Sequence, residues 1–181
     1  LRRAGIIYLS RESGSPRLAG AEDLHAVFNL HEGLSLFLVD AVDRVKPGQG
    51  DAELTLISLV EAILEDPKPI LIAQEKLARE QLAQRLKSQR LPYHQRSARL
   101  REVSWPKPEE AFLERAFAGF SARHPWVRKE DVKPKRVARE LLEENLSFND
   151  YVLRYGIQRV EGLLLRHLGS VYRTLIQTVP E

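Results

Sequence analysis

A run of basic side chains between residues 76 and 101 is the part of the sequence best suited to chemistry with a ligand. Eight of its side chains are Lys or Arg and only Glu80 is acidic, so the segment has a net charge of +7. Cations along a helix can neutralise phosphates and release counterions, which gives salt-dependent binding that is indifferent to nucleic-acid sequence. Tyr93 and His94 could stack on an unpaired base. The expected nucleic-acid-binding residues are Arg79, Arg85, Lys87, Arg90, Tyr93, Arg96, Arg99 and Arg101.

Charge alone leaves a second interpretation of this segment open. Arg and Lys are good helix formers, and a basic helix face can simply be solvated. Residues 1–65 carry six basic and ten acidic side chains, a net charge of −4. The basic face could therefore dock on this acidic third of the chain, on another domain or on a separate partner. The two hypotheses are a nucleic-acid-binding module and a non-catalytic protein-interaction bundle.

Catalytic and metal-binding patterns are missing from the sequence. There is no Cys, which excludes disulfides, cysteine-ligated metals and thiol catalysis. The sequence has no Gly-x-Ser-x-Gly motif and no Gly-x-x-x-x-Gly-Lys-Ser/Thr phosphate-binding loop. No two histidines have metalloprotease spacing, so we expect no metal site. The histidines are His25, His31, His94, His124 and His167.

Three pairs of neighbouring carboxylates also occur, at Glu65-Asp66, Glu109-Glu110 and Glu143-Glu144. Neighbours on a helix point about 100° apart, so we expect caps and solvated helix ends rather than acid–base pairs. A stand-alone enzyme is the weakest of the three functional hypotheses.

Helical periodicity covers nearly all of the chain after residue 23 and predicts a mainly α fold, a bundle of seven or eight helices. The helix over 51–64 is apolar around most of its circumference, so we expect it to be central, with Asp51 as its cap. Ile72, Leu77, Leu82 and Leu86 should point inward from the helix over 69–89. The other expected helices cover 33–45, 93–103, 109 up to His124, 133–142, 148–155 (capped by Ser147) and 158–179.

The first 22 residues differ in character. Gly5 to Leu9 is β-branched and aromatic, and Ser13-Gly14-Ser15-Pro16 is typical of a turn, so a β-hairpin is expected over about 5–19. A lone hairpin is marginally stable, and we expect residues 1–22 to be the tail of a preceding small domain, with 23–181 forming the helical domain. The sequence contains no Met and begins with Leu1, which suggests an excerpt of a longer protein. No apolar run is long enough to span a bilayer, so a cytoplasmic protein without membrane contact is expected.

Several motifs resemble a known family. Ser147-Phe148 through Tyr155-Gly156, Glu161 through Arg166 and Tyr172 through Pro180 resemble the C-terminal helical domain of superkiller and exosome-type DExH-box RNA helicases. More closely, Glu61 through Pro67, Trp105 through Pro108, His124-Pro125-Trp126 and Lys133-Pro134-Lys135 are similar to a domain of unknown function at the C-terminus of actinobacterial members of that superfamily. The resemblance covers roughly residues 24–181.

The resemblance implies an accessory domain of an ATP-dependent superfamily II RNA helicase. In such helicases the helical domain packs on the motor domains and helps form the channel for single-stranded RNA. The implied partners are therefore single-stranded RNA and the motor domains of the same chain. ATP and Mg would bind to those motor domains, which would also carry the hydrolase activity. This fragment itself would need no cofactor. The implied family-motif residues are Phe148, Gly156, Glu161, Gly162 and Arg166.

Elementary physics gives these motif residues mostly structural roles. Glu161 suits the positive end of the last helix, and Gly162 would let another backbone approach closely. Arg166 could pair with Glu161 or Glu143, or face a phosphate, and the nearby carboxylates favour a structural pair. Trp105 and Trp126 should wedge between helices rather than stack on bases.

Overall fold

A computed structural model describes residues 7–12, 15–20, 30–45, 51–125 and 127–178. These residues form a mainly helical fold with eight α-helices, which confirms the predicted fold class. The expected hairpin is present: β1 (Ile7–Glu12) pairs antiparallel with β2 (Ser15–Gly20), with Ile7 opposite Gly20. Its assignment to a preceding domain stays a prediction. None of the described helices is sufficiently long and apolar to cross a bilayer.

Helix α3 (Ala52–Ile63) is central, as its apolar circumference predicts. It contacts α2 (Leu30–Val42), α7 (Ala138–Glu143) and α9 (Glu161–Thr178). Helix α6 (Glu110–Ser121) packs on α2, and both contribute aromatic rings to the first of two cores. There the ring centroids of Phe37 and Phe117 lie 5.5 Å apart, as do those of Phe37 and Phe120, in edge-to-face arrangements.

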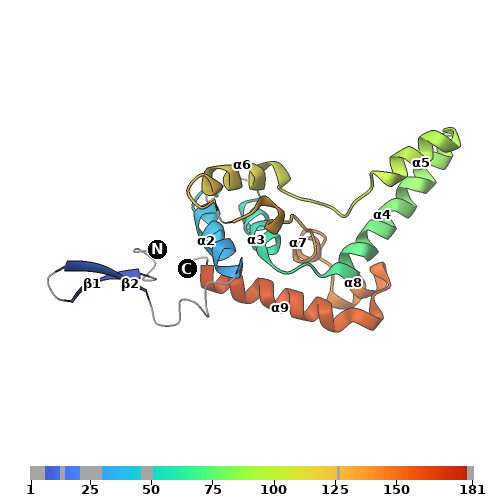
Figure 1. Cartoon of the computed structure of the whole chain (residues 1–181). Helices are drawn as coiled ribbons and strands as arrows, with labels where there is room; N and C mark the ends of the chain where they lie inside the picture. Colours follow the sequence, from blue (N-terminus) through green and yellow to red (C-terminus); the bar gives the residue numbers. More distant parts are fainter. Residues whose placement is uncertain (1–6, 13–14, 21–29, 46–50, 126, 179–181) are drawn as a thin grey trace.

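A second core joins the start of α4 (Lys68–Ser88) to α7, α8 (Phe148–Tyr155) and α9. Its members include Ile70, Val137, Tyr151 and Leu164, all of them fully buried. Helix α9 runs beneath both cores, because Leu164 belongs to the second and Val171 to the first. Figure 1 shows α9 along one edge of the bundle.

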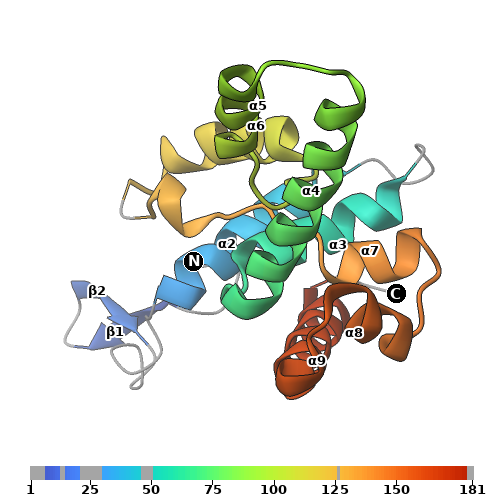
Figure 2. The same cartoon turned by 90° about the vertical axis from the view of Figure 1, so that its right-hand side faces the viewer.

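Helices α4 and α5 (Tyr93–Arg101) form a hairpin that projects from the bundle (Figures 1 and 2). In the first turns of α4, the buried residues are Ile70, Leu71 and Gln74. Beyond these turns Leu86 is the only buried residue of α4, and α5 has none. The turn between the two helices contains Arg90 in the left-handed region, at φ 52°. The hairpin is thus anchored at its base and exposed to solvent along most of its length.

Three local predictions are wrong. Residues 133–137 are not helical, and Lys133 N–H instead donates to the carbonyl of Ala62 (2.9 Å) at the end of α3. The inward position expected for Ile72 is wrong, since this side chain is 65% exposed. Asp51 precedes α3, but its side chain makes no capping hydrogen bond.

The C-terminal elements follow the predicted caps closely. Ser147 Oγ accepts from Asp150 N–H (3.1 Å), and the Asp150 carboxylate accepts in return from the Ser147 N–H, so α8 begins with a capping box. Gly156 ends α8 with φ 62°, a conformation that favours glycine. A 3-10 turn over Gln158–Val160 follows, so α9 begins at Glu161 instead of Gln158. Another such turn, Lys129–Asp131, lies between α6 and α7.

Candidate functional site

A groove of about 430 Å³ lies between α4 and α5. Residues 79, 83 and 87 share one face of α4 because they are four apart, and α5 lies against this face. Arg79 Nε donates to the carbonyl of Leu100 (3.3 Å) and ties the two helices together. The groove is lined by Arg79, Ala83, Lys87, Tyr93, Arg96, Ser97, Leu100 and Arg101.

The groove brings together five of the eight residues expected to bind a nucleic acid: Arg79, Lys87, Tyr93, Arg96 and Arg101. The other three, Arg85, Arg90 and Arg99, do not line it. Arg85 is two residues from Lys87, roughly 200° around the helix, which places it on another face of α4. His94 is exposed but is also outside the groove lining.

Most cations between residues 76 and 101 lack a carboxylate partner. Arg79 pairs with Glu75, and Lys76 lies 4.0 Å from Glu80. No carboxylate lies within 4.0 Å of the remaining six basic side chains, counted over the described part of the chain. These six are Arg85, Lys87, Arg90, Arg96, Arg99 and Arg101. The described residues of the acidic N-terminal third therefore do not neutralise the basic face.

Basic side chains elsewhere are mostly paired. Arg136 contacts Glu143 and Glu144, and Arg123 contacts Asp40 at 2.6 Å. Among the side chains that the structure describes outside residues 76–101, the exceptions are scattered over the start of α4, α6, the turn before α9 and α9 itself. They are Lys68, Arg115, Arg159 and Arg173. The hairpin is thus where unneutralised positive charge is concentrated.

Two groove residues stand out. Tyr93 is 77% exposed, and it makes no ring contact within the described residues. Arg96 is partly buried, and its Nε is covered by protein atoms yet has no hydrogen-bond acceptor. A buried guanidinium N–H without an acceptor is unfavourable, because the group has lost water without gaining a partner.

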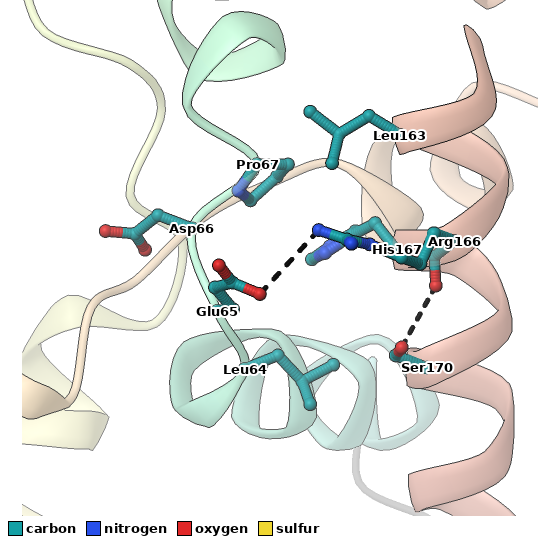
Figure 3. A pocket seen from close by; sticks show the side chains of 8 residues that line it. All are labelled: Leu64, Glu65, Asp66, Pro67, Leu163, Arg166, His167 and Ser170. Atoms are coloured by element: carbon teal, nitrogen blue, oxygen red, sulfur yellow. Dashed lines mark hydrogen bonds and ion pairs between the residues drawn. The ribbon is translucent and has the colours of Figure 1, made fainter. Parts of the chain in front are cut away.

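A smaller cavity of about 140 Å³ lies where the α3–α4 connection meets α9 (Figure 3). Arg166 lies 3.7 Å from Glu65 across it, which corrects the expected pairing with Glu161 or Glu143. Ser170 Oγ donates to the Arg166 carbonyl at 3.0 Å. Asp66 on its rim pairs with Lys133 and Lys135. The charged side chains of this cavity are therefore already paired within the chain.

Behind this cavity, buried Glu61 joins three helices. Its carboxylate accepts from the N–H groups of Val137, Ala138 and Arg139 at the start of α7, at 2.8–3.3 Å. His167 Nε2 of α9 lies 3.0 Å from Glu61 Oε1. An ionised carboxylate only accepts, which assigns the proton to this ring nitrogen. Glu61 was not predicted from the sequence as a buried acid. The signal that could have found it is a carboxylate within the apolar part of a helix, a pattern typical of a buried, partnered acid.

Buried Lys135 stabilises the same C-terminal end of α3. Its Nζ donates to the carbonyls of Glu61 (2.9 Å) and Leu64 (2.7 Å) and pairs with Asp66 at 3.0 Å. Burial lowers the pKa of Lys135, although Asp66 opposes this effect. Partial burial alone would raise the pKa of Asp66, but Lys133 and Lys135 together hold it below its ordinary value. The cluster caps the helix and satisfies its own charges.

A third polar cluster holds the base of α4. Buried Glu140 accepts from Gln74 Nε2 (3.1 Å), Arg154 Nη1 (3.0 Å) and the Tyr155 hydroxyl (2.6 Å). Burial, together with the hydrogen bond to Glu140, raises the pKa of Tyr155. Gln74 Nε2 also donates to the Tyr151 hydroxyl at 2.9 Å. These bonds fix α4 to α7 and α8 at the point where the hairpin leaves the bundle.

The comparisons with known proteins identify the family. A family model with the description "Domain of unknown function (DUF3516)" matches residues 1–181. The chain belongs to the DUF3516 family. No curated protein and no solved structure matches it. The DUF3516 match runs across residue 22, so it includes the hairpin β1–β2 as well as the helices.

Two of the family-motif residues of this DUF3516 chain, Phe148 and Gly156, have clear places in the fold. Phe148 packs on the second core and Gly156 forms the left-handed end of α8. The close backbone approach expected at Gly162 is wrong, because a Cβ there would meet nothing within 4 Å. Trp105 packs on the second core and its Nε1 donates to the Pro134 carbonyl at 3.1 Å, as a wedging role predicts. Trp126 lies outside the described residues.

The remaining expectations concern metals and carboxylate pairs. No group of three or more His, Asp or Glu that could hold a metal occurs in the described part of this DUF3516 chain. The paired carboxylates do not face each other as an acid–base pair. Glu109 and Glu143 pair with Arg139 instead, and Asp66 pairs with the lysines described above. One member of each pair, Asp66, Glu109 and Glu143, is more enclosed than the solvated helix ends that we expected, whereas Glu65 and Glu110 are exposed as expected.

Proposed function

We propose that this chain is the C-terminal accessory domain of an ATP-dependent superfamily II RNA helicase, and that its α4–α5 hairpin guides single-stranded RNA. The concentration of unpaired cations on a projecting hairpin carries this proposal. Unpaired Lys and Arg can contact phosphates without first breaking an internal ion pair, so their binding energy is available to a polyanion. The motif order that resembles exosome-type helicases supports the identity of the parent protein.

ATP, Mg and the hydrolase activity belong, in this proposal, to motor domains of the same chain. The role of the DUF3516 domain is passive: it packs on the motor and holds the RNA backbone. Rigid anchoring of α4 through Gln74 and the second core would fix the direction in which the hairpin presents its charge.

The test is a titration of the 181-residue chain with fluorescent single-stranded RNA at several salt concentrations. The variant Lys87→Gln/Arg96→Gln/Arg101→Gln removes three unpaired groove cations. If each contacts one phosphate, the slope of log K against log salt becomes less steep by about 2, and affinity falls at every salt concentration.

The matched control is Arg115→Gln/Arg159→Gln/Arg173→Gln. It removes the same charge from exposed side chains that also lack carboxylate partners. We expect the control to keep the native salt slope. Equal slopes in the native chain and the groove variant would contradict the proposal, provided that circular dichroism shows both to be folded.

One observation favours the second candidate, a protein-interaction bundle. Leu165, Tyr172 and Ile176 of α9 are each more than 60% exposed. Their spacing of seven and four places them on one helix face, as in a surface that packs on another protein. This candidate predicts that the chain binds no RNA even at low salt, so the same titration separates the two.

A further inference from the structure

We infer that the groove between α4 and α5 receives one unpaired base of the RNA, stacked on Tyr93, and is more than a track for phosphates. This inference rests on the proposed function and specifies what its site recognises. Three features of the groove carry it: its lining, the exposure of Tyr93 and the state of Arg96.

The lining combines a flat ring and apolar side chains with cations. Ala83 and Leu100 contribute apolar surface between the helices, and Tyr93 adds its ring, while Lys87 and Arg101 contribute unpaired charge. A surface that only followed the phosphate backbone would need the cations alone. The volume of about 430 Å³ is within the range of small-molecule pockets, roughly 300–1,000 Å³.

Tyr93 has no structural task that explains its exposure. It begins α5, where it is 77% exposed and contacts no other ring among the described residues. The helix does not need an aromatic residue at this position, because Tyr is only an average helix former. A solvent-facing ring beside unpaired cations is the arrangement by which proteins hold single-stranded nucleic acids, since every base offers a face for stacking.

Arg96 contributes a hydrogen-bond donor that has no acceptor within the described residues. It lies three residues after Tyr93, so the two side chains emerge from the same side of α5. Its Nε is covered and unpartnered, and the side chain lines the groove, where Nε and one Nη are potential donors to a ligand. A phosphate beside the stacked base would accept from both nitrogens, because the guanidinium fork matches phosphate geometry.

The experiment compares two polyanions, a short single-stranded oligouridylate and inorganic polyphosphate, as ligands of the full chain. Tyr93→Leu removes the ring and keeps an apolar side chain. We expect it to weaken RNA binding by about 5- to 150-fold, the loss of one stacked base, and to leave polyphosphate binding unchanged. Tyr93→Phe keeps the ring and should bind RNA nearly as well as the native chain.

Tyr172→Leu is the matched control, because Tyr172 is a similarly exposed tyrosine on α9, away from the groove lining. It should change neither affinity. The base subsite is wrong if Tyr93→Leu leaves RNA affinity intact, or if it weakens both polyanions equally. In either case the proposed function still stands when the groove-cation variant lowers RNA affinity. Failure of the native chain to bind RNA would instead overturn the proposed function itself.

Discussion

Glu61 is the residue on which three helices converge. Its carboxylate is fully buried and accepts three backbone N–H groups of α7 as well as the ring of His167. Removing one partner of a buried charged pair leaves the other groups unsatisfied in a dry environment, which costs about 3–5 kcal/mol. The negative charge also suits the N-terminal end of α7.

We therefore expect Glu61→Ala to lower the free energy of unfolding by about 3–5 kcal/mol in urea titrations. Glu65→Ala, four residues away, removes a solvent-exposed carboxylate that pairs with Arg166 at 3.7 Å and should change stability little. If Glu61→Ala does not fold, Glu61→Gln, which keeps one accepting oxygen, should show an intermediate loss. Equal effects at positions 61 and 65 would argue against the central role of Glu61.

Two glycines should respond oppositely to the same substitution. A Cβ at Gly169, in the middle of α9, would meet nothing within 4 Å. Gly169→Ala should therefore raise the free energy of unfolding by about 1 kcal/mol, because Ala is the better helix former. A Cβ at Gly33 of α2 would lie 2.7 Å from Val127 Cγ2, so Gly33→Ala should destabilise the chain. Thermal melts of the two variants check both signs, and a shift in the same direction would refute this account.

At the scale of elements, the distal half of the α4–α5 hairpin is the least supported part of the described helices. Its only buried side chain is Leu86, which is 1% exposed. Elements with few buried contacts open locally at a lower free energy than the core. The hairpin should therefore open without unfolding the bundle, which keeps its anchored base.

Leu86→Ala tests this division. Losing a buried leucine costs about 2–5 kcal/mol, and here the cost should be confined to the hairpin. We expect faster hydrogen exchange over residues 79–101 in mass spectrometry, with unchanged protection in α3 and α9. Leu82→Ala on the same helix removes a partly buried side chain and should have a smaller effect. Uniform loss of protection over the whole chain would show that the hairpin is not a separate unit.

Much of the helix pattern could be predicted from sequence because caps and apolar periodicity are local. Ser147 and Gly156 bound α8 as expected, and in α6 the i, i+4 spacing of Leu113 and Phe117 indicates a core face, where both are buried. The segment around Lys135 was predicted as helix. Residues 133–137 are instead outside any helix, and Lys135 is bound to carbonyls at the end of α3 more than seventy residues earlier, which local periodicity does not encode.

The candidate site was predictable to a similar extent. The excess of cations between residues 76 and 101 is visible in the sequence, and so is the position of Tyr93. Which cations share the groove depends on how α5 folds back on α4, and that geometry separates Lys87 from Arg85. Likewise, Glu61 is conspicuous in an apolar helix, but its partner His167 lies 106 residues away.

At the scale of the whole molecule, ion pairs link the helices and make stability dependent on pH. Partial burial opposes ionisation of Asp40 and Asp66, yet their Arg and Lys partners hold the pKa of each below its ordinary value. The pKa of Glu143 is lowered in the same way by Arg136 and Arg139. A carboxyl with a lowered pKa in the folded state contributes stability above its unfolded pKa, about 4, and loses it as the pH falls through the folded value.

The contribution of these three carboxyls to the free energy of unfolding should thus be nearly constant from about pH 7 to 5. It should fall steeply below about pH 4. Asp66→Asn removes one contributor, so the loss between about pH 6 and pH 3 should be smaller in the variant than in the native chain, although the variant is less stable at neutral pH. Urea titrations at a series of pH values measure both curves. Parallel curves would mean that Asp66 titrates alike in the folded and unfolded chains, and that its pairs with Lys133 and Lys135 do not hold the end of α3 to the segment that precedes α7.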